Sequence, residues 1–348
     1  MEKNLPLVAV VILSWKGQHF LKRFLPPLLK TTYPNAEYWV IDNASNDGTE
    51  DFLKSNFPEV KSIILEENLG FAGGYNEGLK KIKADYYVLL NQDVEVEPDW
   101  IEPVIAGMEK DKNISAAQPL ILDEKNRDYF EYAGAAGGFI DKLGYPFCRG
   151  RIFDSLEKNE NQYDESIEIF WATGACMFVR ADDFHEAGGL DKDFFAHMEE
   201  IDLCWRLKNK GKRIICITES KVYHVGGGSL PQGNPRKTFL NFRNSLRMLI
   251  KNLPDQKFKR TIFLRLILDG IAALKSLSEG KFSDIGAILK AHISVYKEWN
   301  YWLKKRKLLK KHNDFNNNGL YDKSIIYSYF IKKYKTFKSL NIKTKKID

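Results

Sequence analysis

The sequence predicts an α/β fold, in which a mostly parallel sheet is flanked by helices and followed by a basic helical extension. Over the first hundred residues, short apolar runs alternate with amphipathic stretches of helical spacing, a pattern typical of βαβ units with right-handed crossovers. Beyond residue 230 the pattern changes to long helical stretches rich in Lys and Arg. We therefore expect one domain over residues 1–230 and a basic helical region over residues 231–348.

The expected elements of the first hundred residues follow one another in strand–helix order. Each strand is a short run rich in Val, Ile, Leu and Tyr that ends in polar or Gly-containing sequence. The expected strands cover residues 8–14, 38–42, 61–65 and 86–91, and the expected helices cover residues 20–31, 49–56 and 74–83. Because ligands of parallel sheets bind at the carboxyl ends of the strands, the loops after these strands should converge on one site.

The remainder of this first domain is less regular. Residues 110–162 have weak periodicity and several glycines, so we expect part strand and part surface excursion. Residues 169–180 resemble a strand, and residues 199–210 a helix that stops before Gly211. Two short strands are expected at residues 213–218 and 221–224.

Charge divides the chain into two parts. The first 230 residues carry 26 Lys and Arg against 38 Asp and Glu, a net charge of −12, whereas residues 231–348 carry 27 against 8, a net charge of +19. Such asymmetry indicates a basic region that meets an anionic partner, either a membrane surface or a nucleic acid. The alternative is a set of Lys-rich helices that are simply solvated.

Composition and cysteine use bound the class of protein. With 44% hydrophobic and 28% charged residues the chain is globular, not disordered. Its four cysteines have no paired spacing, which predicts free thiols in a reducing compartment. The apolar run at residues 8–13 is too short for a signal peptide or a membrane span. We therefore expect a cytoplasmic protein.

The helical stretch at residues 262–277 is the most apolar part of the basic region. Arg265, Asp269 and Lys275 interrupt it, which excludes a membrane span. Packing on the main domain is the favoured interpretation. The alternative is an amphipathic helix on an anionic membrane surface. Features that support this alternative are Trp299, Tyr301, Trp302 and the basic run 304–307.

Three motifs carry candidate chemistry. The loop NLGFAGGYNEGL at residues 68–79 places glycines ahead of the expected helix, where backbone N–H groups bind anions, although a tight strand-to-helix connection would have the same composition. Asp93 follows a buried strand, where a carboxylate can hold Mg2+ or Mn2+ together with substrate phosphates or simply cap a turn. His224 precedes the glycines at 226–228 and is a candidate metal ligand beside a flexible segment, or an ordinary histidine.

A helix expected at residue 199 starts with three carboxylates. Glu199, Glu200 and Asp202 lie within four residues, and the helix dipole accounts for two of them. Arg206 lies four residues after Asp202 and should pair with it. Glu199 or Glu200 is then left to act as a general base toward a cleft.

Six segments in this order resemble glycosyltransferase family 2, in particular its bacterial rhamnosyltransferase-like members. They are VAVVILSWKG, VIDNASNDGT, NLGFAGGYNEGL, LLNQDVEV, WATGACMFV and MEEIDLCWR, and the resemblance covers roughly residues 6–228. It implies a GT-A fold, which is a nucleotide-diphospho-sugar transferase sheet with helices on both faces, and inverting transfer from a nucleotide sugar. Residues 1–230 would then be the GT-A catalytic domain.

The resemblance also implies roles for individual residues. The donor would be bound by Ser14, Trp15, Asp42, Asn68, Gly73, Asn76 and Asn91. In the motif Asn91-Gln92-Asp93 the first Asp of the family's DXD motif is Asn, so Asp93 must supply the carboxylate to Mg2+ or Mn2+, with His224 as a second ligand. The pair Glu199-Glu200 matches a Glu-Asp pair whose second residue is the catalytic base, which makes Glu200 the expected base. The expected acceptor residues are Thr173 and Gly174, with Trp171 stacked on a sugar ring.

The expected reaction follows from these roles. Glu200 removes a proton from an acceptor hydroxyl, which attacks the anomeric carbon of a dTDP- or UDP-sugar and inverts its configuration. The resemblance implies a glycan or polyprenyl-diphosphate-linked acceptor, cell-surface polysaccharide synthesis, and a location at the inner face of the membrane. A nucleotidyltransferase is the rival enzyme. Such an enzyme normally has a Gly-rich loop with a basic residue after the first strand to hold a triphosphate, and the corresponding loop of this chain, SWKGQ, has Lys16 alone. A non-catalytic anion-binding protein is the other rival. No nucleic-acid motif accompanies the basic region, so no nucleic acid is expected as a partner.

Overall fold

A mixed sheet forms the centre of the molecule, in a computed structural model that describes residues 5–226, 234–309 and 315–347. Within these residues the sheet has nine strands in the order β11-β13-β6-β12-β4-β1-β2-β3, with β5 paired to β13. Strands β1 to β4 are mutually parallel, and β12 runs antiparallel between β4 and β6. The bounds are β1 Val8–Ser14, β2 Ala36–Asp42, β3 Lys61–Ile64, β4 Tyr86–Asn91, β5 Val94–Val96, β6 Ile114–Asp123, β11 Ile167–Glu168, β12 Cys176–Arg180 and β13 Arg213–His224.

The carboxyl ends of the parallel strands meet at one edge of the sheet, as the sequence predicts. Ser14 lies opposite Asp42 in the pairing of β1 with β2, and Leu13 lies opposite Asn91 in the pairing of β1 with β4. The central strands β1 and β4 are buried along nearly their whole length, because helices cover both faces of the sheet. The helices of this part are α1 Gln18–Leu28, α2 Thr49–Asn56, α3 Gly70–Leu79, α4 Ile101–Glu109, α5 Ala181–Glu186 and α6 Glu199–Asn209.

Helix α3 begins at Gly70, four residues before the expected start at Gly74. Its first N–H groups already have acceptors in the protein. The Gly70 N–H donates to Asn68 Oδ1 at 2.9 Å, and the Phe71 N–H donates to the Phe195 carbonyl oxygen at 2.7 Å. The expectation that these groups are free to bind an anion is therefore wrong, because a distant segment of the chain caps the helix.

The glycines of α3 serve packing against the sheet. A Cβ atom at Gly74 would lie 2.7 Å from the side chain of Leu13, and one at Gly78 would lie 2.0 Å from that of Ile41. Only a residue without a side chain allows the helix to approach β1 and β2 so closely. The tight strand-to-helix connection is thus the correct interpretation of this composition.

A second, smaller sheet joins the middle of the chain to its end. Within the described residues it has five strands in the order β10-β9-β8-β7-β14. Its bounds are β7 Gly138–Asp141, β8 Pro146–Cys148, β9 Arg151–Ile152, β10 Ser155–Leu156 and β14 Leu320–Tyr321. Because β14 pairs with β7, the basic region contributes a strand to a sheet of the first 230 residues. The expected boundary at residues 230 and 231, and the glycines at 227 and 228, lie outside the described residues.

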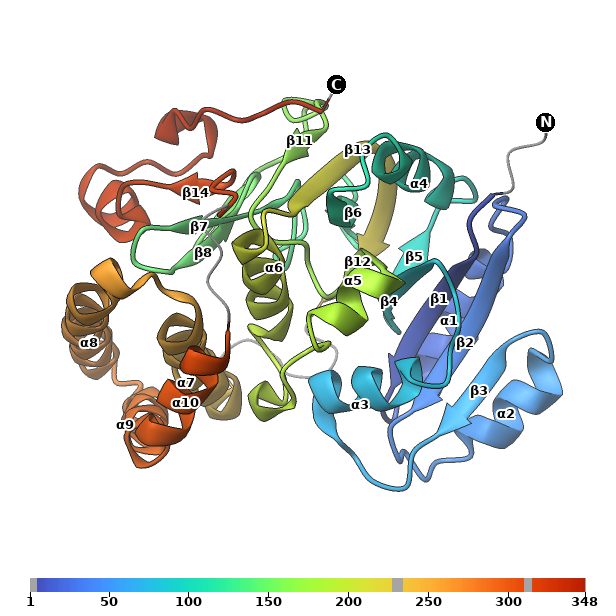
Figure 1. The fold of residues 1–348 in the computed structure, drawn as a ribbon, viewed down its shortest axis with the longest axis horizontal. Helices are drawn as coiled ribbons and strands as arrows, with labels where there is room; N and C mark the ends of the chain where they lie inside the picture. The colour runs from blue at the N-terminus through green and yellow to red at the C-terminus, as the bar shows by residue number, and fades with distance from the viewer. Residues whose placement is uncertain (1–4, 227–233, 310–314, 348) are drawn as a thin grey trace.

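The C-terminal helices gather on one side of the molecule, away from α1, α2 and β3 (Figure 1). They are α7 Pro235–Asn252, α8 Asp255–Ser278, α9 Phe282–Lys297 and α10 Trp299–Leu308. The remaining described segment, 315–347, is mostly extended, with short helical turns at Tyr327–Ile331 and Lys338–Leu340. Another difference lies in β13, which is one strand with a shifted register after Ile217 where two strands were expected.

The aromatic and basic run at residues 299–307 is partly buried. Trp302 is fully buried, Lys305 pairs with Asp191 and Asp193, and Arg306 is buried beside Asp255. These three residues are therefore held in contacts within the protein, whereas Tyr301, Lys304 and Lys307 are exposed. In the described part of the chain, no helix combines the length and apolarity needed to cross a membrane. The four cysteines are buried free thiols, as expected.

Candidate active site

A cavity of about 380 Å³ opens where the parallel strands end. Its walls come from the loops after β1, β2 and β4, the N-terminus of α6, the end of β13 and the first turn of α7. Most of the predicted site residues line it. They are Trp15, Asn68, Asn91, Asp93, Thr173, Gly174, Glu199, Glu200 and His224.

Three predicted donor-binding residues lie behind the cavity wall. Ser14 Oγ donates to Gln92 Oε1 at 2.9 Å, and Gln92 itself lines the cavity. Asp42 Oδ1 accepts the Ser45 N–H at 3.2 Å. Gly73 sits within α3, where a Cβ atom would meet Leu69 at 2.9 Å. These residues therefore support the loops that face the cavity.

Two further predicted residues are held in the interior. The Asn76 amide donates to the Leu190 carbonyl oxygen at 2.6 Å and accepts the Leu190 N–H at 2.9 Å. The Trp171 ring is buried, and its indole N–H donates to the Phe139 carbonyl oxygen at 2.8 Å. The structure thus places Trp171 where no sugar ring can stack on it.

Asp93, His224 and Glu131 form a buried row at one wall of the cavity. His224 Nε2 lies 3.2 Å from Asp93 Oδ1, and His224 Nδ1 lies 3.3 Å from Glu131 Oε1. A carboxylate beside one ring nitrogen fixes the tautomer, so Glu131 would leave Nε2 free to bind a cation with Asp93. Within the described residues, no three His, Cys, Asp or Glu side chains are arranged to hold a metal by themselves. The pair fits a divalent cation whose other ligands are substrate phosphates.

Electrostatics hold this row together in the protein alone. Burial disfavours the imidazolium, but the carboxylates of Glu131 and Asp93 outweigh it and raise the pKa of His224 to about 10. The proton between these groups occupies the position that suits a cation. Glu131 was missed by the sequence analysis, because it lies in the irregular segment 110–162 and no motif marks it.

The segment before α6 has an unusual backbone. Phe195, His197 and Met198 adopt left-handed conformations with φ of 67°, 71° and 73°. Such conformations cost about 1–3 kcal/mol each for residues other than glycine, so neighbouring groups must hold them. This backbone delivers Glu199 and Glu200 to the cavity at the first turn of α6.

Asn244 of α7 holds this segment. Its fully buried side-chain amide donates to the carbonyl oxygens of Phe194 at 2.9 Å, Ala196 at 2.8 Å and His197 at 2.8 Å. Arg243 Nε donates to Asn244 Oδ1 at 2.9 Å, which orients the amide group. No sequence signal marks Asn244, since it lies in the region taken as peripheral.

Each of the two glutamates has one carboxylate oxygen without a hydrogen-bond partner in the part of the chain that the structure describes. Glu199 Oε2 and Glu200 Oε2 are buried and have no hydrogen-bond partner among the described residues. Burial raises the pKa of Glu200 to about 7, and burial together with the charge of Glu200 raises the pKa of Glu199 well above its usual value. The two carboxyls are coupled and titrate as a pair, and burial favours the neutral form of both.

Asp202 is fully engaged, as the sequence predicts. Its Oδ2 accepts from Arg206 Nε and Lys251 Nζ, both at 2.8 Å, and its Oδ1 accepts from Asn252 Nδ2 at 2.8 Å. The predicted pair of Asp202 with Arg206 is confirmed. Lys251 and Asn252 belong to α7, so the basic region also supports the helix that carries the glutamates.

Two cationic residues of α7, Arg236 and Lys237, also line the cavity. Lys237 and burial together lower the pKa of His197, another lining residue, to about 4, with burial the larger cause. An otherwise acidic cavity with two cations at its edge suits ligands that carry phosphate groups. The sequence analysis singled out neither residue, because no motif marks them within the basic region.

Comparison with known proteins decides between the enzymes that the sequence left open. The family model for glycosyl transferase family 2 matches residues 9–186. The chain belongs to this family. A relative from Mycobacterium tuberculosis, N-acetylglucosaminyl-diphospho-decaprenol L-rhamnosyltransferase, is 27% identical over 239 residues, which cover 64% of this chain and 76% of the relative. The protein is thus a family 2 glycosyltransferase, not a nucleotidyltransferase.

Solved structures agree on the fold. The crystal structure of GalNAc-T7 with UDP, GalNAc and Mn2+ superposes with a TM-score of 0.58 at 19% identity, covering 88% of this chain and 59% of that one. The mannosyltransferase PcManGT from Pyrobaculum calidifontis, in complex with GDP-Man and Mn2+, gives 0.51 at 13% identity, covering 87% and 85%. The expected GT-A fold with a helical C-terminal region is confirmed, and the family uses nucleotide sugars as donors.

Proposed function

We propose that this glycosyltransferase is metal-dependent and inverting, and that it transfers a sugar from a dTDP- or UDP-sugar to a lipid-linked glycan. The observation that carries the proposal is that Glu200 and the pair of Asp93 and His224 line one cavity. A base for the acceptor and a cation site for the donor diphosphate are the two requirements of such a transfer.

Glu200 acts as the general base. Its carboxylate takes the proton of the acceptor hydroxyl, whose oxygen attacks the anomeric carbon from the face opposite the nucleoside diphosphate. The C–O bond to the diphosphate breaks as the new bond forms, so the configuration inverts. Gly174 lies beside Glu200 at the cavity, where a Cβ atom would lie 3.2 Å from the Phe71 ring and 3.8 Å from Glu200 Cβ.

Asp93 and His224 would hold Mg2+ or Mn2+, with Glu131 fixing the His224 tautomer. A bound cation neutralises the charge that develops on the departing diphosphate. Trp15, Asn68 and Asn91 then bind the nucleoside part of the donor. The Mn2+ in the two similar solved structures supports this assignment.

The acceptor is proposed to be a polyprenyl-diphosphate-linked glycan used in cell-surface polysaccharide synthesis. The mycobacterial relative is named for a diphospho-decaprenol acceptor. Arg236 and Lys237 line the cavity, where they could bind the diphosphate of such an acceptor in addition to that of the donor. Four buried free thiols suit a reducing cytoplasm. We place the enzyme at the inner membrane face, with residues 1–230 as the catalytic domain and residues 231–348 completing it.

Asp93→Ala tests the metal assignment. We expect Mn2+ to strengthen binding of dTDP or UDP to the wild type, and the variant to bind about tenfold more weakly in its presence, with the affinity measured without metal unchanged. Isothermal titration with and without Mn2+ gives both affinities. Asp47→Ala, at an exposed loop aspartate, is the control. Equal metal dependence in all three proteins would contradict the assignment, and retention of the anomeric configuration in the product, read by NMR, would exclude inversion.

The pH profile should reflect the buried Glu200. A raised pKa means that the carboxyl is protonated, and unable to act as a base, until the pH rises through about 7. We therefore expect kcat/KM to fall below pH 7, well above the range in which an exposed glutamate titrates. Steady-state rates measured across pH at fixed ionic strength give this acidic limb of the kcat/KM profile. A rate that stays level down to pH 5 would argue against Glu200 as the base.

A further inference from the structure

Helix α8 exposes an apolar stripe along its outer side. Phe263, Ile267, Ile271 and Leu274 are spaced by four, four and three residues, so they share one face of the helix, and they are between 46% and 65% exposed. The buried residues of α8 lie on its opposite side, against α7 and the smaller sheet. The stripe therefore has no partner among the described residues.

Helix α9 packs against α8 and extends the apolar surface. Its exposed apolar residues are Phe282, Leu289, Ile293 and Tyr296, of which Phe282 is 70% exposed. Leu277 at the end of α8 adds to the same turn between the two helices. A surface of this extent on a water-soluble fold marks an interaction site.

This surface reaches the mouth of the active-site cavity. Thr238 of α7 donates to Asp284 of α9 at 3.0 Å, so the first turns of the two helices lie side by side. Arg236 and Lys237 of that α7 turn line the cavity, and the exposed Phe282 lies two residues from Asp284. The apolar turn between α8 and α9 thus borders the entrance for the acceptor.

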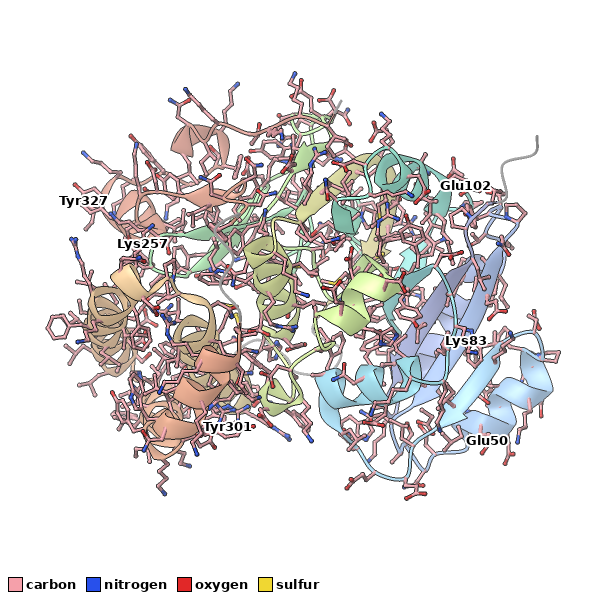
Figure 2. All side chains as sticks on the ribbon, in the orientation of Figure 1. Glu50, Lys83, Glu102, Lys257, Tyr301 and Tyr327 are labelled. Carbon is pink, nitrogen blue, oxygen red and sulfur yellow. The ribbon has the colours of Figure 1, made fainter. Side chains whose placement is uncertain are left out.

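Basic residues surround the apolar surface. Exposed Lys257 lies in the first turn of α8, and Tyr301 lies in the first turn of α10, on this helical side of the molecule (Figure 2). The exposed cations of α8 and α9 are Lys257, Lys259, Arg260, Lys275, Lys290 and Lys297. A second copy of the chain, docked by two-fold symmetry, would bring these cations together. An anionic lipid surface matches both the charge and the apolar stripe, since it attracts the cations while its acyl chains take up the apolar side chains.

We propose that the outer face of α8 and α9 docks on an anionic lipid bilayer, with Phe263, Leu274 and Phe282 inserted among the acyl chains. The proposal rests on the proposed function only for the purpose of docking. A protein bound to the bilayer in this way would receive the diphosphate of a lipid-linked acceptor at Arg236 and Lys237. It places the membrane contact on α8 and α9 instead of the run 299–307, because Trp302 and Arg306 of that run are buried.

Vesicle binding tests the surface without any substrate. We expect the wild type to co-sediment with vesicles of phosphatidylcholine and phosphatidylglycerol in a two-to-one ratio. The triple variant Phe263→Gln, Ile267→Gln and Leu274→Gln should bind about tenfold more weakly. The matched control replaces three exposed apolar residues elsewhere, Leu5→Gln, Ile64→Gln and Tyr129→Gln, and should bind as the wild type does.

Two further measurements separate the surface from the reaction. Transfer to a short water-soluble acceptor should be equal in the wild type and both variants; if no protein transfers sugar but the wild type binds vesicles, the proposed function fails and the surface stands. Wild type that ignores these vesicles, or binds pure phosphatidylcholine equally, would overturn the proposal. Sedimentation that shows a wild-type dimer and a monomeric triple variant, without vesicle binding, would also overturn it and make this face a contact between copies.

Discussion

Replacing Glu200 with Gln should lower turnover by about 10²–10⁴-fold, the usual contribution of a general base, while donor affinity stays nearly unchanged. Gln keeps the size and the hydrogen-bonding capacity of Glu but cannot accept the proton at neutral pH. The buried position of Glu200 Oε2, which has no partner within the described residues, leaves that atom free for the acceptor hydroxyl. Single-turnover rates together with donor titrations separate the two quantities.

Glu199→Gln is the matched variant. Burial and the neighbouring charge raise the pKa of Glu199 well above its usual value. This shift favours the neutral carboxyl, which the amide replaces with little change. We expect turnover within about tenfold of the wild type. If Glu199→Gln shows the large loss and Glu200→Gln does not, the roles of the two residues are exchanged.

The loss of turnover in Glu200→Gln should come with a gain in stability. Because burial raises the folded pKa of Glu200 from the ordinary value of 4.5 to about 7, its carboxyl lowers the stability of the fold progressively between these two pH values, and the full loss is present above pH 7. Gln never ionises, so the variant should be more stable above pH 8, by about 2–3 kcal/mol. Thermal unfolding at pH 6 and pH 8.5 measures this, and a variant that is less stable at both would show that its low turnover comes from misfolding.

Local patterns of the sequence were enough to predict the sheet edge and its polar loops. Buried strands, and the residues that follow them, are adjacent in the chain, so the convergence of Ser14, Asp42 and Asn91 follows from the parallel order of the strands alone. The same holds for the pair of Asp202 with Arg206, which is one helical turn apart. Where neighbours in sequence are neighbours in space, pattern and structure agree.

The supporting contacts of the site could not be predicted in this way. The Phe195 carbonyl oxygen that caps α3 lies more than one hundred residues away in the chain, and Glu131 reaches His224 from an irregular segment. Such contacts depend on how the elements pack, which no local periodicity records. Trp171 was expected to stack on a sugar ring because it lies in a matched motif. The motif does not specify the packing that buries this side chain against Phe139.

Part of the positive charge of the basic region is used inside the protein, which no local pattern predicts. Lys251 and Lys305 pair with Asp191, and Lys251 also pairs with Asp202. The acidic first domain and the basic region neutralise one another around α6. The basic region, which contains none of the six motifs, therefore supports α6, the helix that carries Glu199 and Glu200.

Asn244→Ala should lower kcat about 10²-fold and change donor affinity much less. The amide of Asn244 holds three carbonyl oxygens of the strained segment before Glu199. Without it, the left-handed residues relax, and a base displaced by about 1 Å loses a rate factor of this size. Asn244→Asp should lose as much, because its carboxylate has the same shape but cannot donate to the carbonyls.

A purely structural role for Asn244 would have a different outcome. Ser245→Ala removes the neighbouring hydroxyl, which accepts from Arg265 at 2.9 Å on the other side of α7, and it should lower the melting temperature with kcat unchanged. In Asn244→Ala we expect the acidic limb of the kcat/KM profile to move as well, because the movement of α6 alters the burial that raises the pKa of Glu200. A lower melting temperature with an unaltered limb and an unaltered kcat would reduce Asn244 to a stabilising residue. A shift of the acidic limb of the kcat/KM profile would show that Asn244 of α7 positions the general base Glu200 through the segment before α6.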